Sequence, residues 1–254
     1  MHNVSDTVTI GGFPTIRLTR DELAALMVHD CIANQNTRTA LPKLVFSSNG
    51  QGISLAGTDR RFAEAMSHAD IIHADGMSVV VASRLLTNRP LPERIATTDF
   101  ITNAAPAAVK AGLSFYLLGG SEQQNKAACD ALQSQYPELR IAGRHHGHID
   151  DQADERLCAE IVASRTDVLW VALGKPKQEL WCVRNRQRLT GVGWIKTCGG
   201  LFAFLSNEVS RAPAWMQDRG LEWLYRTMQE PTRLGWRYLV TNPHSMYRMV
   251  RFSR

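Results

Sequence analysis

Two aspartates of this chain are the candidates for a general base. Asp75 ends the segment IIHAD (71–75), an apolar run of strand type that stops at Gly76. A carboxylate on a tight turn at the end of a strand can take a proton from a hydroxyl group. Asp99 lies in the first turn of an expected helix, where the helix dipole also favours an acidic residue. Turn formation or helix capping is the commoner role for such aspartates, so residue type alone ranks Asp75 first and Asp99 second.

Four expected strands end in polar or glycine-rich segments. In a parallel sheet, ligands collect at the carboxyl ends of the strands, where glycine lets the backbone approach them and helix N–H groups suit phosphate. These segments are SSN (47–49), ADG (74–76), LGGS (118–121) and LGKPKQE (173–179). The lysines of the last segment suit a phosphate, although lysines beside a proline are often merely exposed. Candidate ligand contacts are therefore Ser47, Asn49, Gly76, Gly119, Gly120, Gly174, Lys177, Gln178 and Glu179.

The signatures of several common sites are missing from the sequence. No G-x-G-x-x-G segment follows a strand and there is no Walker A sequence, which disfavours ordinary dinucleotide and P-loop proteins. No D-x-D pair is present, so a metal-bridged diphosphate has no obvious ligand set. His145, His146 and His148 are close in sequence, but only the last two share a face of a strand. We therefore predict neither a cofactor nor a metal ion, and expect these histidines in a loop or an acceptor contact.

Short β-branched runs alternate with helical patterns over the first 210 residues. Thr19-x-x-Glu22 and Ser121-x-x-Gln124 have the spacing of helix caps. This alternation favours an α/β fold with a mainly parallel sheet covered by helices on both faces. We expect strands near 13–18, 43–47, 70–73, 114–118, 139–143, 167–173 and 193–198. Helices are expected near 19–34, from the loop 49–52 to about His68, and near 77–86, 98–111, 121–136, 153–164, 176–188 and 200–206.

The excess positive charge is confined to the end of the chain. The net charge is +5, and residues 211–254 hold eight arginines against three acidic residues, so residues 1–210 are neutral. The same segment holds three of the six tryptophans, a mixture that predicts contact with an anionic lipid surface or another polyanion. We therefore divide the chain into an α/β catalytic domain, 1–207, and a basic, aromatic-rich helical appendage, 208–254. Pro231 predicts two helices in the appendage, meeting near Glu230.

Composition also indicates where the chain works. No apolar run approaches the roughly eighteen residues of a membrane-spanning helix. The first twelve residues lack the basic and apolar regions of a secretory signal, and the five cysteines are odd in number and never spaced C-x-x-C. Such cysteines are typical of reduced thiols in the cytosol. We expect a cytoplasmic protein held by its tail at the inner face of the cytoplasmic membrane, with the oligomeric state open and a homo-oligomer included.

Five segments of the chain resemble the WecG/TagA/CpsF glycosyltransferase family. They are ADIIHADGMSVVVASRLL (69–86), PERIATTDF (92–100), FYLLGG (115–120), LGKPKQELW (173–181) and RAPAWMQDRGLEWLYRTMQEPTRLGWRYL (211–239). They occur in the family's order and extend over most of the chain. The resemblance implies a Rossmann-like α/β domain with a C-terminal appendage. It also implies an inverting, metal-independent transferase that moves a sugar from UDP to a saccharide on polyprenyl diphosphate at the cytoplasmic leaflet.

The same resemblance implies roles for residues at the strand ends. The aspartate of the family's ADG segment, its proposed base, matches Asp75. Asn49 matches the asparagine of the family's T-x-N segment, and Ser47 stands in place of its threonine. Gln178 matches a glutamine that contacts the donor.

Arginines form the second matched set. Arg94 precedes IATTD (95–99), in which Thr97 replaces the glycine of the family's usual V-T-G-x-D segment. Guanidinium groups hold phosphate oxygens bidentately and stay charged, so they can stabilise a departing diphosphate without a metal. We expect some appendage arginines to close over the diphosphate and the rest to bind anionic headgroups. Those that match the family are Arg211, Arg226, Arg233 and Arg237.

Some alternatives stay open at this point. N-acetylmannosamine, its uronic acid and glucose all fit the resemblance as donor sugars. A nucleotide-sugar oxidoreductase or epimerase is a second class of protein, but it would need a dinucleotide fingerprint and a Tyr-x-x-x-Lys pair, which the chain lacks. A nucleic-acid-binding protein is a third, but it would mix lysines among the arginines of the tail, where there are none. We therefore expect a UDP-sugar and a lipid-linked acceptor as partners, and no nucleic acid.

Overall fold

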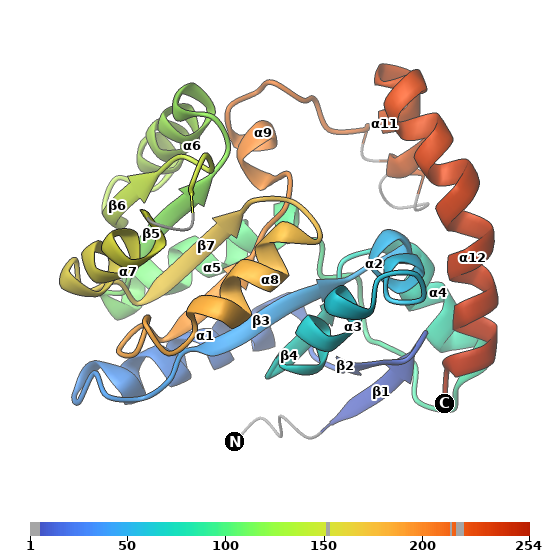
Figure 1. Cartoon of the computed structure of the whole chain (residues 1–254), viewed down its shortest axis with the longest axis horizontal. Coiled ribbons are helices and arrows are strands. Elements are labelled where there is room, and N and C mark those ends of the chain that lie inside the picture. The colour runs from blue at the N-terminus through green and yellow to red at the C-terminus, as the bar shows by residue number, and fades with distance from the viewer. Residues whose placement is uncertain (1–5, 151–152, 214, 217–220) are drawn as a thin grey trace.

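Six parallel strands form the central sheet (Figure 1). The structure is a computed structural model that describes residues 6–150, 153–213, 215–216 and 221–254, without the side chains of residues 153, 226, 233 and 234. The strands lie in the order β4-β3-β8-β7-β5-β6, and every neighbouring pair is parallel. Their bounds are β3 Lys43–Ser48, β4 Ile71–Ala74, β5 Ser114–Gly119, β6 Arg140–His145, β7 Val168–Ala172 and β8 Trp194–Thr197. The predicted α/β fold and its parallel sheet are confirmed.

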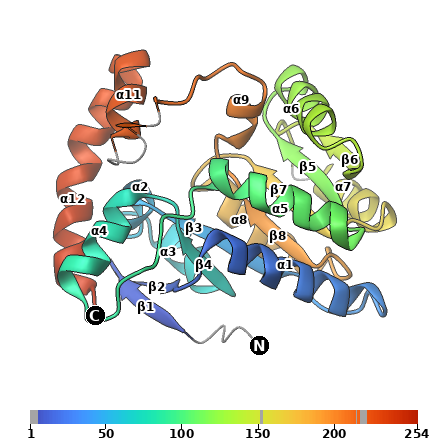
Figure 2. The ribbon, with the colours of Figure 1, turned by 180° about the vertical axis from the view of Figure 1, so that it is seen from behind.

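Helices cover both faces of the sheet because successive strand residues point to opposite sides. In β5, Phe115 and Leu117 pack with one group of helices, whereas Tyr116 and Leu118 pack with the other. The first group, seen in Figure 2, is α1 (Arg20–Gln35), α5 (Thr97–Ala111), α6 (Glu122–Gln135) and α9 (Leu201–Leu205). The second is α2 (Gly50–Leu55), α3 (Arg60–Ser67), α4 (Met77–Leu86), α7 (Ala153–Ala163) and α8 (Lys177–Asn185). Such two-sided burial explains why the strands read as continuous apolar runs.

A separate antiparallel hairpin precedes the sheet. It pairs β1 (Thr7–Ile10) with β2 (Phe13–Ile16) through a two-residue turn. Gly11 and Gly12 in that turn have φ of +59° and +94°, as a tight hairpin of this length requires. The expected strand near 13–18 therefore exists, but it pairs with a strand that was not predicted and lies outside the central sheet.

The segment from Gly50 to Ser67 corrects one prediction. A single helix was expected there, but α2 ends at Leu55 and α3 begins after Asp59, whose side chain accepts the Phe62 N–H at 3.1 Å. The break includes Gly57, where an added Cβ would lie 2.6 Å from the His244 ring. The turn is therefore packed against the C-terminal part of the chain, a contact that local sequence does not reveal. The two predicted caps at Thr19 and Ser121 are confirmed.

The C-terminal segment returns across the molecule to the N-terminal hairpin. After α11 (Glu222–Gln229), a π-helical turn at Pro231–Gly235 leads into α12 (Trp236–Phe252), which confirms two helices meeting near Glu230. α12 lies beside α2 and α4 (Figure 1). Arg254 and Thr9 then exchange backbone hydrogen bonds of 3.0 and 3.2 Å. The division of the chain at residue 207 remains a prediction.

No helix within the described ranges is long and apolar enough to cross a membrane.

Candidate active site

Asp75 is held rigidly at the carboxyl end of β4. Its backbone N–H donates to the Ser48 carbonyl at 2.8 Å, at the end of the neighbouring strand β3. Its Oδ1 accepts the backbone N–H of Thr97 at 2.9 Å, and its Oδ2 accepts the Asn49 side-chain amide at 3.1 Å. Each carboxylate oxygen has more than one lone pair, so both can still accept a further proton donor. The side chain is half-buried, which fits a base that is oriented but reachable.

Asn49 and Gly76 complete the immediate surroundings of Asp75. Asn49 is the N-cap of α2, and its Oδ1 accepts the Gly52 N–H at 3.0 Å. The same side chain therefore starts a helix and orients the carboxylate. Gly76 begins α4, and an added Cβ there would lie 3.1 Å from the Cβ of Asn49. Two of the predicted ligand contacts thus lie directly beside the predicted base.

The turn between β7 and α8 reaches under the same strand ends. The Lys175 Nζ donates to the Ser47 carbonyl at 2.9 Å and pairs with the fully buried Glu179 at 2.8 Å. The Gln178 Nε2 also donates to Glu179, and the Gln178 Oε1 accepts the Gly199 N–H at 3.1 Å. Gln178 is likewise buried. These residues connect the ends of β3, β7 and β8 into one hydrogen-bonded unit, while a direct donor contact by Gln178 stays a prediction.

A cluster of two arginines and two carboxylates joins the start of α5 to the C-terminal segment. Arg94 pairs with Asp99 at 3.0 Å and with Glu222 of α11 at 3.1 Å. Arg211 also pairs with Asp99, and its Nε lies 3.5 Å from Glu222. Asp99 therefore lies between two guanidinium groups, whereas Asp75 contacts only neutral donors among the residues described. This contrast favours Asp75 over Asp99 as the base.

Lys196 was not predicted, yet it is fully buried next to the candidate site. It is completely buried in β8, between β3 and β7, and its Nζ donates to the Thr197 carbonyl at 2.6 Å. Burial lowers its pKa to about 8, although Cys198 and Asp75 favour the charged form. On the same face of the sheet, burial and the positive charge of Lys196 hold the pKa of His73 well below its usual value. A lysine inside the apolar strand GWIKTC (193–198) was the sequence signal that could have revealed this position.

A groove of about 820 Å³ opens at the ends of β5 and β7, and its lining residues do not include Asp75, Arg94 or Lys196. The helix after β5 packs on one face of the sheet and the helix after β7 on the other, so the two loops diverge there, as at ligand sites in open parallel sheets. Gly119 needs its φ of +131° and close backbone approach, because an added Cβ would lie 2.3 Å from the Ala172 carbonyl oxygen. Residues lining the groove include Gly120, Lys177, Arg61, Arg184, His148 and Trp181.

The remaining predicted contacts are only partly gathered at this site. Gly174 has a φ of +73°, and its carbonyl accepts the Gln178 N–H at 2.9 Å, which starts α8. The Arg237 guanidinium stacks on the Tyr238 ring, 4.9 Å from its centre. The side chains of Arg226 and Arg233 lie outside the described part of the chain, so their roles stay predictions.

The three histidines lie close together at the end of β6. His145 ends β6, and His146 and His148 follow it, with successive ring centres 4.4 and 5.9 Å apart. Within the described ranges, no three side chains of His, Cys, Asp or Glu are placed to hold a metal ion. His148 instead lines the groove.

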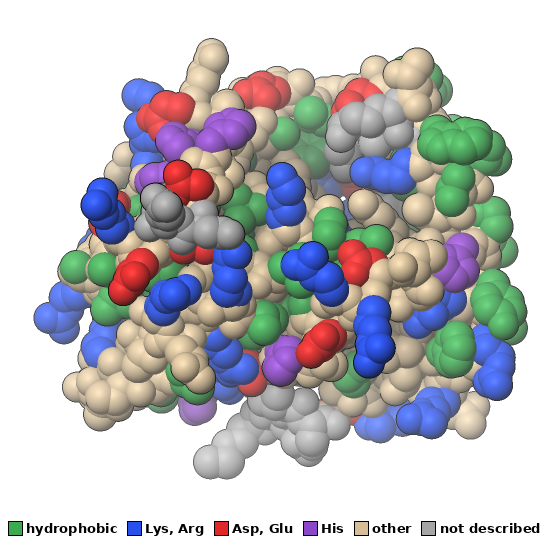
Figure 3. Space-filling view, in the orientation of Figure 1, with side chains coloured by type: hydrophobic (Ala, Val, Ile, Leu, Met, Phe, Trp, Pro, Cys, Tyr) green, Lys and Arg blue, Asp and Glu red, His purple; other side chains and the backbone are tan. Residues whose placement is uncertain are grey.

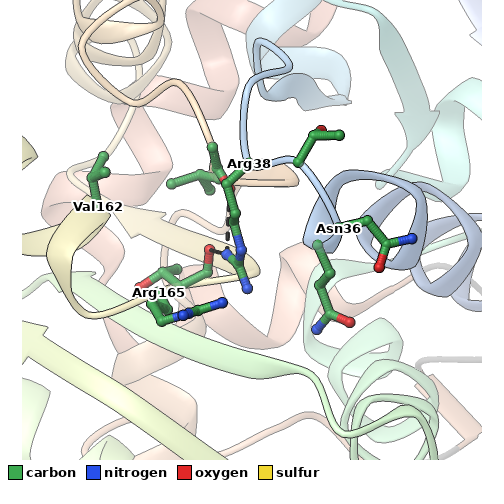
Figure 4. A pocket seen from close by; sticks show the side chains of 9 residues that line it. Asn36, Arg38, Val162 and Arg165 are labelled. Atoms are coloured by element: carbon green, nitrogen blue, oxygen red, sulfur yellow. Dashed lines mark hydrogen bonds between the residues drawn. The ribbon is translucent and has the colours of Figure 1, made fainter.

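A smaller pocket of about 360 Å³ lies at the opposite, amino end of the strands (Figure 4). Arg38 points into it and donates to the carbonyls of Thr166 and Gly191 at 2.9 and 3.3 Å. It also pairs at 2.7 Å with the buried Asp167, which in turn accepts the Ser114 N–H at 2.8 Å. Arg38 and Asp167 neutralise each other's charge at the amino ends of the strands. We therefore interpret this pocket as structural.

A fixed carboxylate, nearby arginines and a groove at the carboxyl ends of a parallel sheet suit group transfer from an anionic donor. Comparison with known proteins defines the class: the protein is a glycosyltransferase with a Rossmann-like core. The chain belongs to the glycosyl transferase WecG/TagA/CpsF family, whose model matches residues 8–254. The resemblance seen in the sequence is therefore confirmed, and the oxidoreductase and nucleic-acid alternatives are not favoured.

Two curated relatives share one name, N-acetylglucosaminyldiphosphoundecaprenol N-acetyl-beta-D-mannosaminyltransferase. That of Bacillus subtilis (strain 168) is 33% identical over 185 residues, covering 73% of this chain and 70% of the relative. That of Staphylococcus aureus (strain MW2) is 30% identical over 222 residues, covering 87% of this chain and 84% of the relative.

Proposed function

We propose that this chain transfers N-acetylmannosamine from UDP to an N-acetylglucosamine carried on polyprenyl diphosphate, inverting the anomeric centre. The observation that carries the proposal is the position of Asp75, matched to the family's ADG segment and held between Asn49 and the start of α5. The names of the curated relatives support this donor sugar and this acceptor over the uronic acid and glucose.

In this mechanism Asp75 is the general base. The acceptor hydroxyl oxygen attacks the anomeric carbon from the side opposite UDP, so the new C–O bond forms as the bond to the diphosphate breaks. Asp75 takes the hydroxyl proton during this step. Because the two hydrogen bonds to its carboxylate come from a helix start and a helix cap, the group needs little reorganisation when the acceptor arrives.

The negative charge that develops on UDP is met by arginines of this chain. Arg94 and Arg211 are fixed by Asp99 and Glu222 near the start of α5, and Arg94 has more guanidinium donors than these two carboxylates use. Arginine suits this role because it stays charged and binds phosphate oxygens in pairs. The groove lined by Gly120 and Lys177 is the proposed seat of the nucleotide, since its volume is in the range of small-molecule sites and its basic side chains outnumber Glu64.

The outer face of α12 is the proposed membrane-binding surface. Trp236 and Val250, each 70% exposed, mark the ends of an apolar stripe that also contains Leu239, Val240, Met246 and Tyr247. These residues recur at helical spacing, whereas the inner face carries His244, bonded to Ser54 at 3.0 Å, and the buried Ser245. Figure 3 shows the hydrophobic side chains along the edge over α12.

The charge of the same segment supports a lipid surface as the partner of this stripe. Residues 231–254 contain five arginines and no acidic residue. Apolar side chains beside arginines are the combination that binds anionic membranes at their interface. The lipid-linked acceptor that the relatives' names specify would lie in such a membrane. We propose that the protein works as a peripheral protein at the cytoplasmic face of the membrane.

A double substitution in α12, Val240→Glu with Val250→Glu, should separate membrane binding from catalysis. A buried valine contributes roughly 1.5 kcal/mol, so losing both should weaken binding to phosphatidylglycerol vesicles by about 100-fold. Turnover on acceptor embedded in those vesicles should fall with it, whereas turnover on a short-chain, water-soluble acceptor should not. Ile32→Glu, which places one such negative charge on an exposed site of α1, is the control. Unchanged vesicle binding by the α12 variant would rule out this surface.

The proposed reaction is tested by UDP release. Purified protein is given UDP-N-acetylmannosamine, its uronic acid, UDP-glucose or UDP-N-acetylglucosamine, with and without short-chain polyprenyl-diphosphate N-acetylglucosamine. We expect release with UDP-N-acetylmannosamine that depends on the acceptor and persists with EDTA. Release that ignores the acceptor, or is abolished by EDTA, would contradict the proposal.

A further inference from the structure

Lys196 is a buried lysine that has no carboxylate partner among the residues the structure describes. It is fully inaccessible, and no Asp or Glu oxygen within the described ranges lies at ion-pair distance from its Nζ. Its contacts are the Thr197 carbonyl at 2.6 Å and the Thr97 hydroxyl at 3.5 Å. Burying an ammonium group with so little compensation costs free energy, which an apolar side chain in the same strand would not. A purely structural strand at the centre of a sheet has no need of this residue.

The surroundings of Lys196 belong to the candidate active site. Burial lowers its pKa to about 8, Cys198, Asp75 and Glu179 favour its charged form, and Lys175 opposes it. Lys196 in turn lowers the pKa of the buried His73. Lys196 is therefore charged at neutral pH, and Asp75 is among the groups that interact most strongly with that charge.

Thr97 connects Lys196 to Asp75. Its backbone N–H donates to the Asp75 Oδ1 at 2.9 Å, and its hydroxyl faces Lys196. The side chain is only 5% exposed, so it is directed into the protein and not toward the open site. This is the residue that replaces glycine in the IATTD segment (95–99). A glycine would keep the N–H but would lack the hydroxyl that faces Lys196.

We propose that Lys196 is a positioning residue for the transfer reaction, acting through Thr97 to fix the start of α5 and the carboxylate of Asp75. The Lys196 ammonium group contacts the Thr97 hydroxyl, and the Thr97 backbone N–H donates to the Asp75 carboxylate. Thr97 couples Lys196 to Asp75. The threonine that stands in place of the family's glycine therefore has a function inside the site. The inference rests on the proposed role of Asp75 as the base.

The test compares Lys196→Met, Thr97→Val and the double variant with the wild type. Methionine and valine keep the volume and remove the charge or the hydroxyl. We expect Lys196→Met to lower kcat by about 10–100-fold with the donor KM within about three-fold, and Thr97→Val to lower kcat by about 10-fold. The double variant should be no worse than Lys196→Met, because both changes break one coupling. Lys126→Met, which removes an exposed lysine paired with Asp130, is the control.

The pH profile is the readout that a structural role would not change. Wild-type kcat should fall as pH rises through about 8, where Lys196 loses its proton. Lys196→Met should lack this fall, and its kcat should match the high-pH value of the wild type throughout. If the fall persists in Lys196→Met, or if the effects of the two single variants multiply in the double variant, the proposal is wrong. Thr97→Val alone still tests the coupling if Lys196→Met does not fold.

Failure of the base assignment would look different. If Asp75→Asn retained wild-type turnover, the role of Asp75 would be lost whatever the Lys196 variants do. If Asp75→Asn were inactive while Lys196→Met kept the wild-type kcat and pH profile, only the present inference would be overturned.

Discussion

Replacing Asp75 with asparagine should lower the kcat of sugar transfer by on the order of 10³-fold, with the donor KM changed by less than about three-fold. Asparagine has nearly the same shape, and its carbonyl oxygen can still accept the Thr97 N–H. It cannot take a proton from the acceptor hydroxyl at neutral pH. The loss should therefore appear in the chemical step and not in donor binding, and single-turnover kinetics measures it directly.

Two comparisons make this result specific to the base. In Asp75→Asn the new side-chain amide would face the Asn49 amide, which in the wild type donates to the Asp75 Oδ2, so one hydrogen bond is lost at a cost of about 1 kcal/mol. Thermal unfolding should show that this small loss leaves the protein folded. Asp99→Asn, which loosens the pairs with Arg94 and Arg211, should affect binding more than kcat. If Asp99→Asn lost the chemical step and Asp75→Asn kept it, the two roles would be exchanged.

The second large effect is expected at Arg94. Arg94→Ala should lower kcat/KM by about 10²–10³-fold, because it removes fixed positive charge from the departing diphosphate. Arg94→Lys should recover only part of the activity, since an ammonium keeps the charge but lacks the paired donors. The competitive inhibition constant for UDP should rise in parallel, as expected for a residue that contacts the diphosphate.

Arg89→Ala provides the matched control. Arg89 is exposed and pairs with Asp6, so its loss should leave kcat/KM within about two-fold of the wild type. Arg94→Ala also leaves Asp99 and Glu222 sharing Arg211, and a thermal unfolding curve separates that structural loss from the kinetic one. Near-normal kcat/KM in Arg94→Ala would show that the diphosphate is stabilised elsewhere.

Local sequence predicted most of the central fold because each signal there acts over short distances. The caps at Thr19 and Ser121 fix helix starts from residues three apart, and the buried strands are continuous apolar runs. The hairpin strand Thr7–Ile10 and the break at Gly57 were missed for another reason. Both depend on contacts with the end of the chain, through Arg254 and His244, more than 180 residues away.

For the candidate site as well, the residues at strand ends were predicted, whereas those brought in by long-range contacts were not. Asp75 and Asn49 belong to recognisable strand ends, and the parallel pairing of β3 with β4 brings them together. Lys196 belongs to no motif. Its place in an apolar strand is a weak sequence signal, and the fold adds that β8 lies between β3 and β7 with no carboxylate beside Lys196 among the residues described. Glu222 was missed because its link to Arg94 joins positions 128 residues apart. The exposed apolar stripe of α12, the proposed membrane-binding surface, needed the fold as well, since packing decides which side of α12 is inward.

The configuration of the product tests the central claim most directly. Wild-type protein is supplied with UDP-N-acetylmannosamine, α-linked at its anomeric carbon, and short-chain polyprenyl-diphosphate N-acetylglucosamine, and the lipid product is examined by NMR. The account predicts one new N-acetylmannosamine per acceptor, joined through a β linkage, because a single displacement inverts the anomeric centre. A product with an α linkage, or no lipid-linked product with any UDP-sugar, would contradict it.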